Sequence, residues 1–164
     1  MNMLTDYEQG IIDHVAEHGW HCTNVFDPTE RVPNFSYSIG LWETLCTSEL
    51  IVFGLDLELM HKLLWAMYRQ LKAGAQLANG ARWSGLLGGF DCISRPVHPS
   101  QIKDEYFNSA LWYRERRAGD SNLSAYQIFW PGAVDGLFPW EKGAADIVRE
   151  LQPSLYLPDQ AGLA

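Results

Sequence analysis

Two neighbouring stretches between residues 34 and 55 carry the clearest hydrophobic pattern in the chain. Residues 35–41 read Phe-Ser-Tyr-Ser-Ile-Gly-Leu, so the large apolar side chains fall at every second position. Successive side chains of a strand point to opposite faces, and the pattern therefore predicts a strand with one apolar and one small polar face. Residues 50–55 are almost continuously apolar, which is typical of a strand covered on both sides. We expect a short loop between the two strands and antiparallel pairing.

A period of three to four residues predicts three helices around these strands. The first begins at a capping box opened by Thr5 and ends at Gly19. The second has Asp56 as its N-cap and ends at Gly74, and the third is expected to begin at Ser100. Each presents one apolar face, as a helix packed on a sheet should.

Further strands are expected at residues 20–26, 90–97 and 124–130, whereas residues 75–89 are glycine-rich and allow only a strand that starts near Ala75. Helices and strands interleave irregularly, and this favours antiparallel pairing.

We therefore predict an α+β fold: a single domain over residues 1–151, with a mixed, mostly antiparallel sheet and about three flanking helices. A loosely held tail is expected over residues 152–164, which contain prolines and small residues.

Composition and charge narrow the class of protein. The 164 residues are 47% hydrophobic, which suffices for one core without disulfides or metals. A net charge of −8 argues against nucleic-acid binding, which needs a basic face. The N-terminus lacks the features of a signal peptide, and no apolar stretch reaches membrane-spanning length. Three cysteines without CxxC spacing fit a reduced setting, so we expect a cytoplasmic protein that binds neither nucleic acid nor membrane.

Three histidines at the end of the first helix form a secondary candidate for a metal site. His14 and His18 are four residues apart, and His21 on the next strand could supply a third ligand. However, His14 is not followed by the glutamate of an HExxH motif, and His18 directly precedes the helix-ending Gly19. We favour a structural role for His18 at the edge of the core, and we predict no cofactor.

Two cysteines are weak candidates for a nucleophile. Cys22 or Cys46 would need a nearby cation and a histidine base to act as a thiolate. Cys22 alternates with Trp20 along the predicted strand, and this favours a buried structural thiol. The glycines at positions 80 and 85 have phosphate-loop spacing without the lysine and hydroxyl residue that the loop requires.

The densest remaining signal is residues 127–140, QIFWPGAVDGLFPW. Aromatic residues with Pro and Gly at the end of a strand can build a concave wall for a flat or apolar ligand. The same residues can instead form an aromatic lid over the sheet edge, which is the interpretation that we favour. The candidate ligand-binding residues are Ser38, Gln127, Trp130 and Trp140.

These motifs resemble a bacterial family of unknown function, DUF4262. The pattern of that family contains His-Gly-Trp at a helix end, a Tyr-(Ser/Thr)-Ile-Gly-Leu strand, a Glu-Leu strand, a Gln-x-x-Trp-Pro turn and Gly-x-Phe-Pro-Trp. The corresponding residues here are 18–20, 37–41, 49–50, 127–131 and 136–140.

The chain departs from this pattern at Ser48, where Pro is usual, and at Gly132, where the family usually has Asp. If that Asp were catalytic, this chain would be impaired unless Asp135 replaced it from the same turn. The resemblance implies a bacterial, cytoplasmic protein. It also marks His18, Tyr37, Ser38, Glu49 and Gln127 as the polar positions to examine for a pocket.

Two classes of function remain. The first is a binding module that recognises a protein partner or a small ligand through an aromatic groove, for example an immunity protein that neutralises a basic toxin. The second is an enzyme in which His18 or Glu49 is the general base and Gln127 or Tyr37 orients the substrate. The enzyme requires that these four side chains meet in one pocket.

Overall fold

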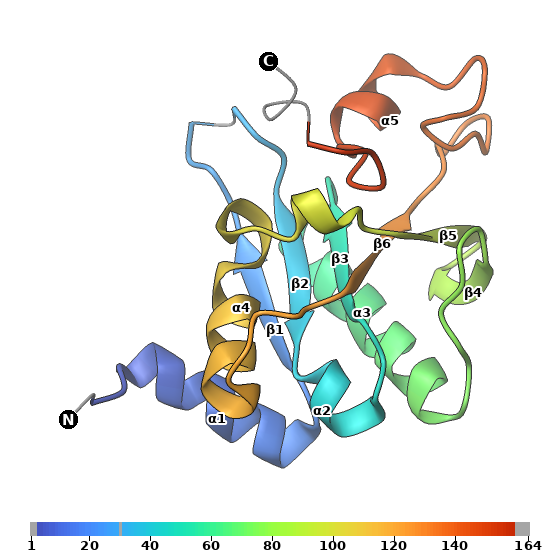
Figure 1. Cartoon of the computed structure of the whole chain (residues 1–164). Coiled ribbons are helices and arrows are strands. Elements are labelled where there is room, and N and C mark those ends of the chain that lie inside the picture. The colour runs from blue at the N-terminus through green and yellow to red at the C-terminus, as the bar shows by residue number, and fades with distance from the viewer. Residues whose placement is uncertain (1–2, 30, 160–164) are drawn as a thin grey trace.

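A six-stranded mixed sheet forms the centre of the computed structural model, with helices on both faces (Figure 1). The structure describes residues 3–29 and 31–159; the outer ends of the expected domain and tail fall outside these ranges. The strand order is β1-β2-β3-β6-β5-β4. The strands are β1 (His21–Val25), β2 (Phe35–Ile39), β3 (Glu49–Phe53), β4 (Arg82–Leu87), β5 (Phe90–Pro96) and β6 (Ala125–Phe129).

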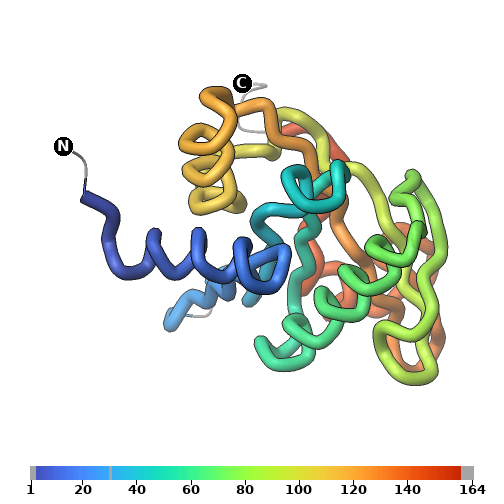
Figure 2. The backbone as a smooth tube through the Cα atoms, turned by 90° about the horizontal axis from the view of Figure 1, so that it is seen from below, coloured from blue at the N-terminus to red at the C-terminus, as the bar shows by residue number. Residues whose placement is uncertain are grey.

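Within the described ranges, three long helices and three short ones surround this sheet. The long ones are α1 (Asp6–His18), α3 (Leu57–Lys72) and α4 (Asp104–Ala118). The short ones are α2 (Leu41–Leu45), α5 (Asp146–Glu150) and the 3₁₀ helix η1 (Pro99–Gln101). The tube in Figure 2 places α3 on one side of the sheet and both α1 and α4 on the other. Among the described residues, no helix is both long and apolar enough to cross a membrane.

The pairing confirms the predicted α+β fold with a mixed, mostly antiparallel sheet. Every neighbouring pair of strands is antiparallel except β3 and β6, which run parallel with Ile51 opposite Gln127. Strands β3 and β6 are neighbours at the centre of the sheet, but the chain between them passes through α3, β4, β5 and α4. Parallel neighbours need such a long crossover connection.

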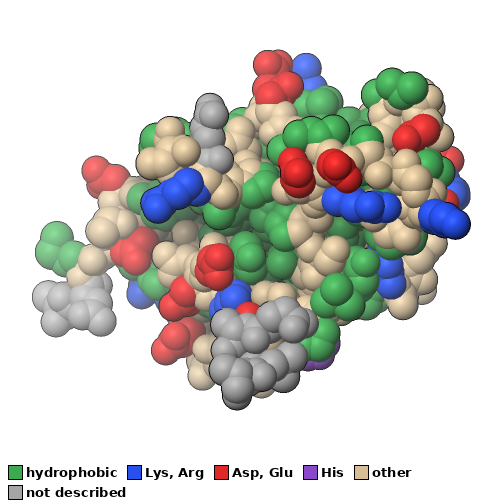
Figure 3. Space-filling view, turned by 90° about the horizontal axis from the view of Figure 1, so that it is seen from above, with side chains coloured by type: hydrophobic (Ala, Val, Ile, Leu, Met, Phe, Trp, Pro, Cys, Tyr) green, Lys and Arg blue, Asp and Glu red, His purple; other side chains and the backbone are tan. Residues whose placement is uncertain are grey.

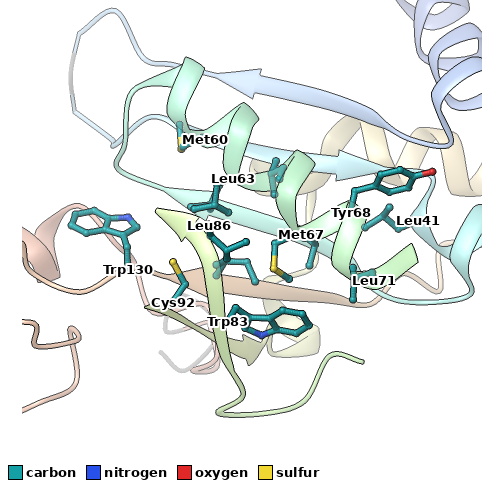
Figure 4. Close-up of a cluster of buried hydrophobic side chains, with 14 of the residues drawn as sticks. Leu41, Met60, Leu63, Met67, Tyr68, Leu71, Trp83, Leu86, Cys92 and Trp130 are labelled. Atoms are coloured by element: carbon teal, nitrogen blue, oxygen red, sulfur yellow. The ribbon is translucent and has the colours of Figure 1, made fainter. Parts of the chain in front are cut away.

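Two hydrophobic clusters form on the two faces of the sheet, as the alternation in β2 and the apolar run in β3 predicted. On one face α3 packs against Leu50, Val52 and Ile128. On the other, α1 and α4 cover Phe35, Tyr37, Ile39, Ile51 and Phe53. Figure 4 shows the α3 cluster, with Trp130 at one end and Leu41, Tyr68 and Leu71 at the other.

Three expected boundaries were wrong. The loop between β2 and β3 contains the helix α2, which begins immediately after Gly40; the backbone of Gly40 is in a left-handed conformation. Strand β4 begins at Arg82 rather than near Ala75. Ser100 lies in η1, whose start is capped by the His98 side chain accepting the N–H of Ser100, and α4 begins only at Asp104. Short helices with few turns leave little periodicity to detect.

The C-terminal segment is packed against the sheet at two points, in contrast to the loose tail that we expected from residue 152. Gln152 and Leu155 are buried, with only 1% of each residue exposed. The Gln152 amide accepts from the Trp130 N–H at 3.0 Å and donates to the Trp130 carbonyl at 2.9 Å. This side chain therefore pairs with the backbone just beyond the end of β6, as a neighbouring strand would.

Replacing Gln152 by Leu is expected to lower the free energy of unfolding by about 2–4 kcal/mol, because the backbone N–H and C=O of Trp130 would both lose a buried partner. Urea denaturation of both proteins measures this difference. The exposed Leu157 provides the control, and Leu157→Ala should change stability by less than about 0.5 kcal/mol. Equal stability of Gln152→Leu and the parent protein would contradict this anchoring role.

Candidate functional site

The carboxylate of Glu49 is the most deeply buried charge-bearing group among the described residues, with none of its surface exposed. It accepts three hydrogen bonds: from the Ser38 hydroxyl at 2.8 Å, from the Gly40 N–H at 2.6 Å and from the Leu41 N–H at 3.2 Å. The Ser38 oxygen in turn accepts from the Leu50 N–H at 2.8 Å. Glu49 and Ser38 thus satisfy the backbone donors where the β2–β3 ladder ends and α2 begins.

Gly40 allows this arrangement. Its φ of 102° lies in the left-handed region, which glycine enters without strain. A Cβ at this position would lie 2.9 Å from Cγ1 of Val15 in α1. The residues Ser-Ile-Gly-Leu and Glu49 are therefore explained by the hydrogen bonds and the left-handed backbone that this turn requires. The polar atoms of Ser38 and Glu49 are all used in these hydrogen bonds.

Burial raises the pKa of the Glu49 carboxyl to about 7, whereas the three donors lower it. A raised carboxyl pKa can mark a general acid or base. Such a group must also reach a substrate, but Glu49 is fully buried and lines none of the surface hollows described below.

Tyr37 and Gln127 lie on the α1/α4 face of the sheet, on either side of Ile51 in the same cross-strand row. The Tyr37 hydroxyl accepts from the backbone N–H of Ser109 in α4 at 3.0 Å. Both ends of the Gln127 amide bind the C-terminal segment, donating to Pro153 at 2.7 Å and accepting from Leu155 at 3.0 Å.

His18 lies at the end of α1, away from the other three candidates. We expected it at the core edge, but 46% of its side chain is exposed, and its Nε2 atom lies 3.8 Å from a carboxylate oxygen of Glu17. The side chains of His18, Tyr37, Glu49 and Gln127 therefore have separate neighbours and do not converge on one pocket. The geometric condition for the enzyme hypothesis is not met by these four residues.

The two tryptophans of the expected groove lie on opposite faces of the sheet. Trp140 stacks on Phe138 and meets Phe129 edge-on, on the face that carries Gln127. The Arg95 guanidinium lies 4.7 Å from the centre of the Trp140 ring and covers it. Trp130 belongs to the α3 cluster on the other face. The segment after β6 thus divides its aromatic residues between two locations, so a single wall containing Gln127, Trp130 and Trp140 is not formed.

An apolar hollow does open beside Trp130, and we call it the Trp130 hollow. It has a volume of about 470 Å³ and lies where the start of α3, the β4–β5 hairpin and the turn after β6 meet. Its lining consists of Leu55, Leu59, Lys62, Leu86, Leu87, Gly88, Phe90, Trp130, Pro131 and Ala133. Lys62 is the one charged residue among them.

The position of the Trp130 ring is fixed by hydrogen bonds on two sides. Its indole N–H donates to the Phe53 carbonyl at 2.7 Å, and its backbone is held by Gln152. A ring held in this way cannot turn to fill the hollow without losing a buried hydrogen bond. The sequence singled out Trp130 but not its partners, because Leu59, Leu87 and Phe90 read as ordinary core positions until the topology brings them together.

A second hollow, of about 290 Å³, is lined by His14, His18, His21, His61, Trp20, Trp65 and Cys22; we call it the histidine hollow. The Nδ1 atoms of His14 and His21 lie 2.8 Å apart. Burial, with smaller effects of His14 and His61, lowers the pKa of His21 to about 4. No group of three or more His, Cys, Asp or Glu side chains within the described ranges is arranged to hold a metal ion.

The thiols are poorly suited to nucleophilic chemistry. All three cysteines are free. Burial raises the pKa of both Cys22 and Cys92 to about 12, so both are protonated at neutral pH. Cys46 is exposed at the end of α2 in a left-handed conformation and lies outside the histidine hollow.

The turn that contains Gly132 has no free space for a side chain at that position. A Cβ on Gly132 would lie 2.6 Å from Oδ1 of Asp135, which accepts the N–H of Leu137 at 2.9 Å. The Asp135 carboxylate therefore occupies the space that a side chain at position 132 would enter.

The raised pKa of Glu49 predicts that its contribution to the free energy of unfolding depends on pH. Because the folded-state pKa of about 7 exceeds the ordinary value of 4.5, the unfolded chain loses this proton first as the pH rises. The stabilisation from Glu49 is fully present below pH 4.5 and is lost as the pH rises through 7. The excess stability of the parent protein over Glu49→Gln should fall by about 3 kcal/mol across this window.

Chemical denaturation at several pH values between 4.5 and 7.5 measures the free energy of unfolding of both proteins. Subtracting the value of Glu49→Gln from that of the parent protein cancels the contributions of the other titrating groups. A difference that rises with pH would mean that the three hydrogen-bond donors outweigh burial. That result would contradict the raised pKa.

The comparison with known families agrees with the motifs. A family described as a domain of unknown function (DUF4262) matches residues 14–145, which is most of the chain. No curated protein and no solved structure matches the chain at a significant level. The His-Gly-Trp, Ser-Ile-Gly-Leu and Phe-Pro-Trp motifs all lie within the matched residues. The chain therefore belongs to the DUF4262 family.

Proposed function

We propose that this protein is a binding module whose ligand is a small apolar molecule with an anionic head group, bound in the Trp130 hollow. The observation that carries the proposal is the lining of this hollow, which is apolar apart from Lys62. Its volume of about 470 Å³ falls in the range of small-molecule sites, roughly 300–1,000 Å³.

The one charged residue of the lining, Lys62, supports an anionic head group. Lys62 pairs with Glu58 on the same helix at 3.2 Å, and both side chains are more than two-thirds exposed, at 71% and 80%. An exposed pair of this kind contributes about 0.5 kcal/mol or less. The ammonium group can therefore turn to a ligand carboxylate at little cost, while the apolar part of the ligand contacts Trp130 and the leucines.

The distribution of charged side chains on the surface favours a small-molecule ligand over a large basic protein partner. Recognition of a basic toxin would use a continuous acidic surface. On the face shown in Figure 3, acidic and basic side chains are instead interspersed among hydrophobic ones. The free cysteines and the family resemblance favour a bacterial cytoplasmic setting for this binding module.

Decanoate and decanol, which differ in the head group alone, test the proposal by isothermal titration calorimetry. One decanoate should bind per chain, and decanol should bind more weakly. Lys62→Ala should remove the preference for decanoate and leave binding of decanol within about twofold. The absence of saturable binding by both compounds would contradict the proposal.

Two adjacent residues provide a matched pair of variants. Ala133 lines the hollow, whereas Val134 is fully exposed and does not. Ala133→Glu should weaken decanoate binding at least tenfold, since it places a negative charge at the rim, and Val134→Glu should change it less than twofold. Equal effects of the two substitutions would assign the binding to another part of the surface.

A further inference from the structure

One arginine on the α1/α4 face of the sheet is held by two aromatic rings. The guanidinium carbon of Arg95 in β5 lies 3.7 Å from the centre of the Tyr156 ring and 4.7 Å from the centre of the Trp140 ring. The two rings are nearly perpendicular, at 87°. Contacts of this kind stabilise the cation and restrict the motion of its side chain.

The backbone that carries the two rings is itself fixed. Arg149 donates to the backbone carbonyls on both sides of Trp140, at 2.9 and 3.0 Å. The residue before Tyr156 donates its backbone N–H to Gln127 at 3.0 Å. The position of the Arg95 guanidinium is therefore set before any ligand arrives, which lowers the entropy cost of binding.

The Arg95 guanidinium has no anionic partner. A guanidinium carries five N–H donors, and none of those of Arg95 meets a hydrogen-bond acceptor or a carboxylate among the described residues. The residue is only partly exposed. Its nitrogen atoms are nevertheless absent from the fully buried atoms without a partner, so each of them reaches the surface.

Arg114 provides a comparison within the same chain. Its guanidinium also lies over an aromatic ring, 4.4 Å from the centre of Trp42, and it pairs with Asp120 at 2.8 Å. Carboxylates are not scarce, because the chain has 20 acidic residues against 12 lysines and arginines. Arg95 is stacked in a similar way but lacks the carboxylate that completes the site of Arg114.

Arg82 of β4 brings a second cation to the same face. It lies opposite Ile93, two residues before Arg95, and diagonal neighbours of this kind are about 7–8 Å apart. Its guanidinium lies 5.7 Å from the centre of the Phe138 ring, which stacks on Trp140 at 5.3 Å. In the part of the chain that the structure describes, Arg82 has no carboxylate partner either.

We propose that Arg95 and Arg82 bind the phosphate group of a small phosphate monoester, at a site separate from the Trp130 hollow on the other face of the sheet. The planar fork of a guanidinium binds two oxygen atoms of a phosphate. Two guanidinium groups favour a dianion, and a phosphate monoester carries about two negative charges at neutral pH. The one carboxylate of β5, Asp91, is about 13 Å from Arg95 along the strand.

Isothermal titration calorimetry with phenyl phosphate and benzenesulfonate, at constant ionic strength and about pH 8, tests the site, because the two compounds share a ring and carry about two and one negative charges. One phenyl phosphate should bind per chain, at least fivefold more tightly than benzenesulfonate. Arg95→Gln should weaken its binding at least tenfold, and Arg82→Gln should reduce the preference over benzenesulfonate to less than twofold. The absence of saturable binding, or equal affinity for both compounds, would overturn the proposal.

Arg116→Gln is the matched control. It removes the same charge from an exposed position of α4, and it should change the affinity for phenyl phosphate less than twofold. An effect as large as that of Arg95→Gln would mean that net charge alone attracts the phosphate, and it would overturn the assignment of the site.

Nitrogen NMR of the arginine side chains in the parent protein avoids any loss of folding in the variants. Phenyl phosphate should shift the Nε–H signals of Arg95 and Arg82. The signal of Arg114 should not change, since its Nε–H already donates to Asp120 at 2.8 Å. Shifts confined to other arginines, or to residues of the Trp130 hollow, would contradict the proposal.

Discussion

The fold depends on a buried carboxylate. Moving a charge out of water is costly. The three hydrogen bonds that Glu49 receives from Ser38, Gly40 and Leu41 offset only part of this cost, because burial still raises the pKa of its carboxyl. These contacts stabilise the connection between β2 and β3 at the start of α2. The residues of β3 that follow Glu49 pack on both faces of the sheet. Because Gly40 is also pressed against Val15 of α1, the same point fixes how α1 approaches the sheet.

The family motifs are explained mainly by such fold-forming contacts. Gly19 ends α1 and Trp20 stacks on Tyr68 of α3. Gln127 binds the C-terminal segment, and the carbonyl of Pro139 accepts from Arg149 at 2.9 Å. Polar residues in short motifs look like candidates for chemistry in a sequence. Here Tyr37, Ser38, Glu49 and Gln127 satisfy backbone groups that would otherwise be buried without partners. His18 is the exception, because its side chain is 46% exposed.

Local patterns predicted the three long helices and most of the strands, and long-range contacts decided how these elements are arranged. The capping box of Thr5, the N-cap Asp56 and the alternation in β2 are encoded by neighbouring residues. The parallel pairing of β3 with β6 and the packing of Gln152 on Trp130 join segments far apart in sequence, so no local pattern reveals them. The Trp130 hollow has the same origin, because three separate segments line it.

The central claim is that the binding surface of this protein is the Trp130 hollow and not the polar motif residues. Proton–carbon NMR of the methyl groups and proton–nitrogen NMR of the backbone, recorded while decanoate is added, tests this claim most directly. The account predicts shifts at Leu59, Leu87 and Ala133, which line the hollow, with Tyr37 and Gln127 unchanged. Shifts centred on Tyr37, Glu49 and Gln127 would contradict it and return the search for function to the motif residues.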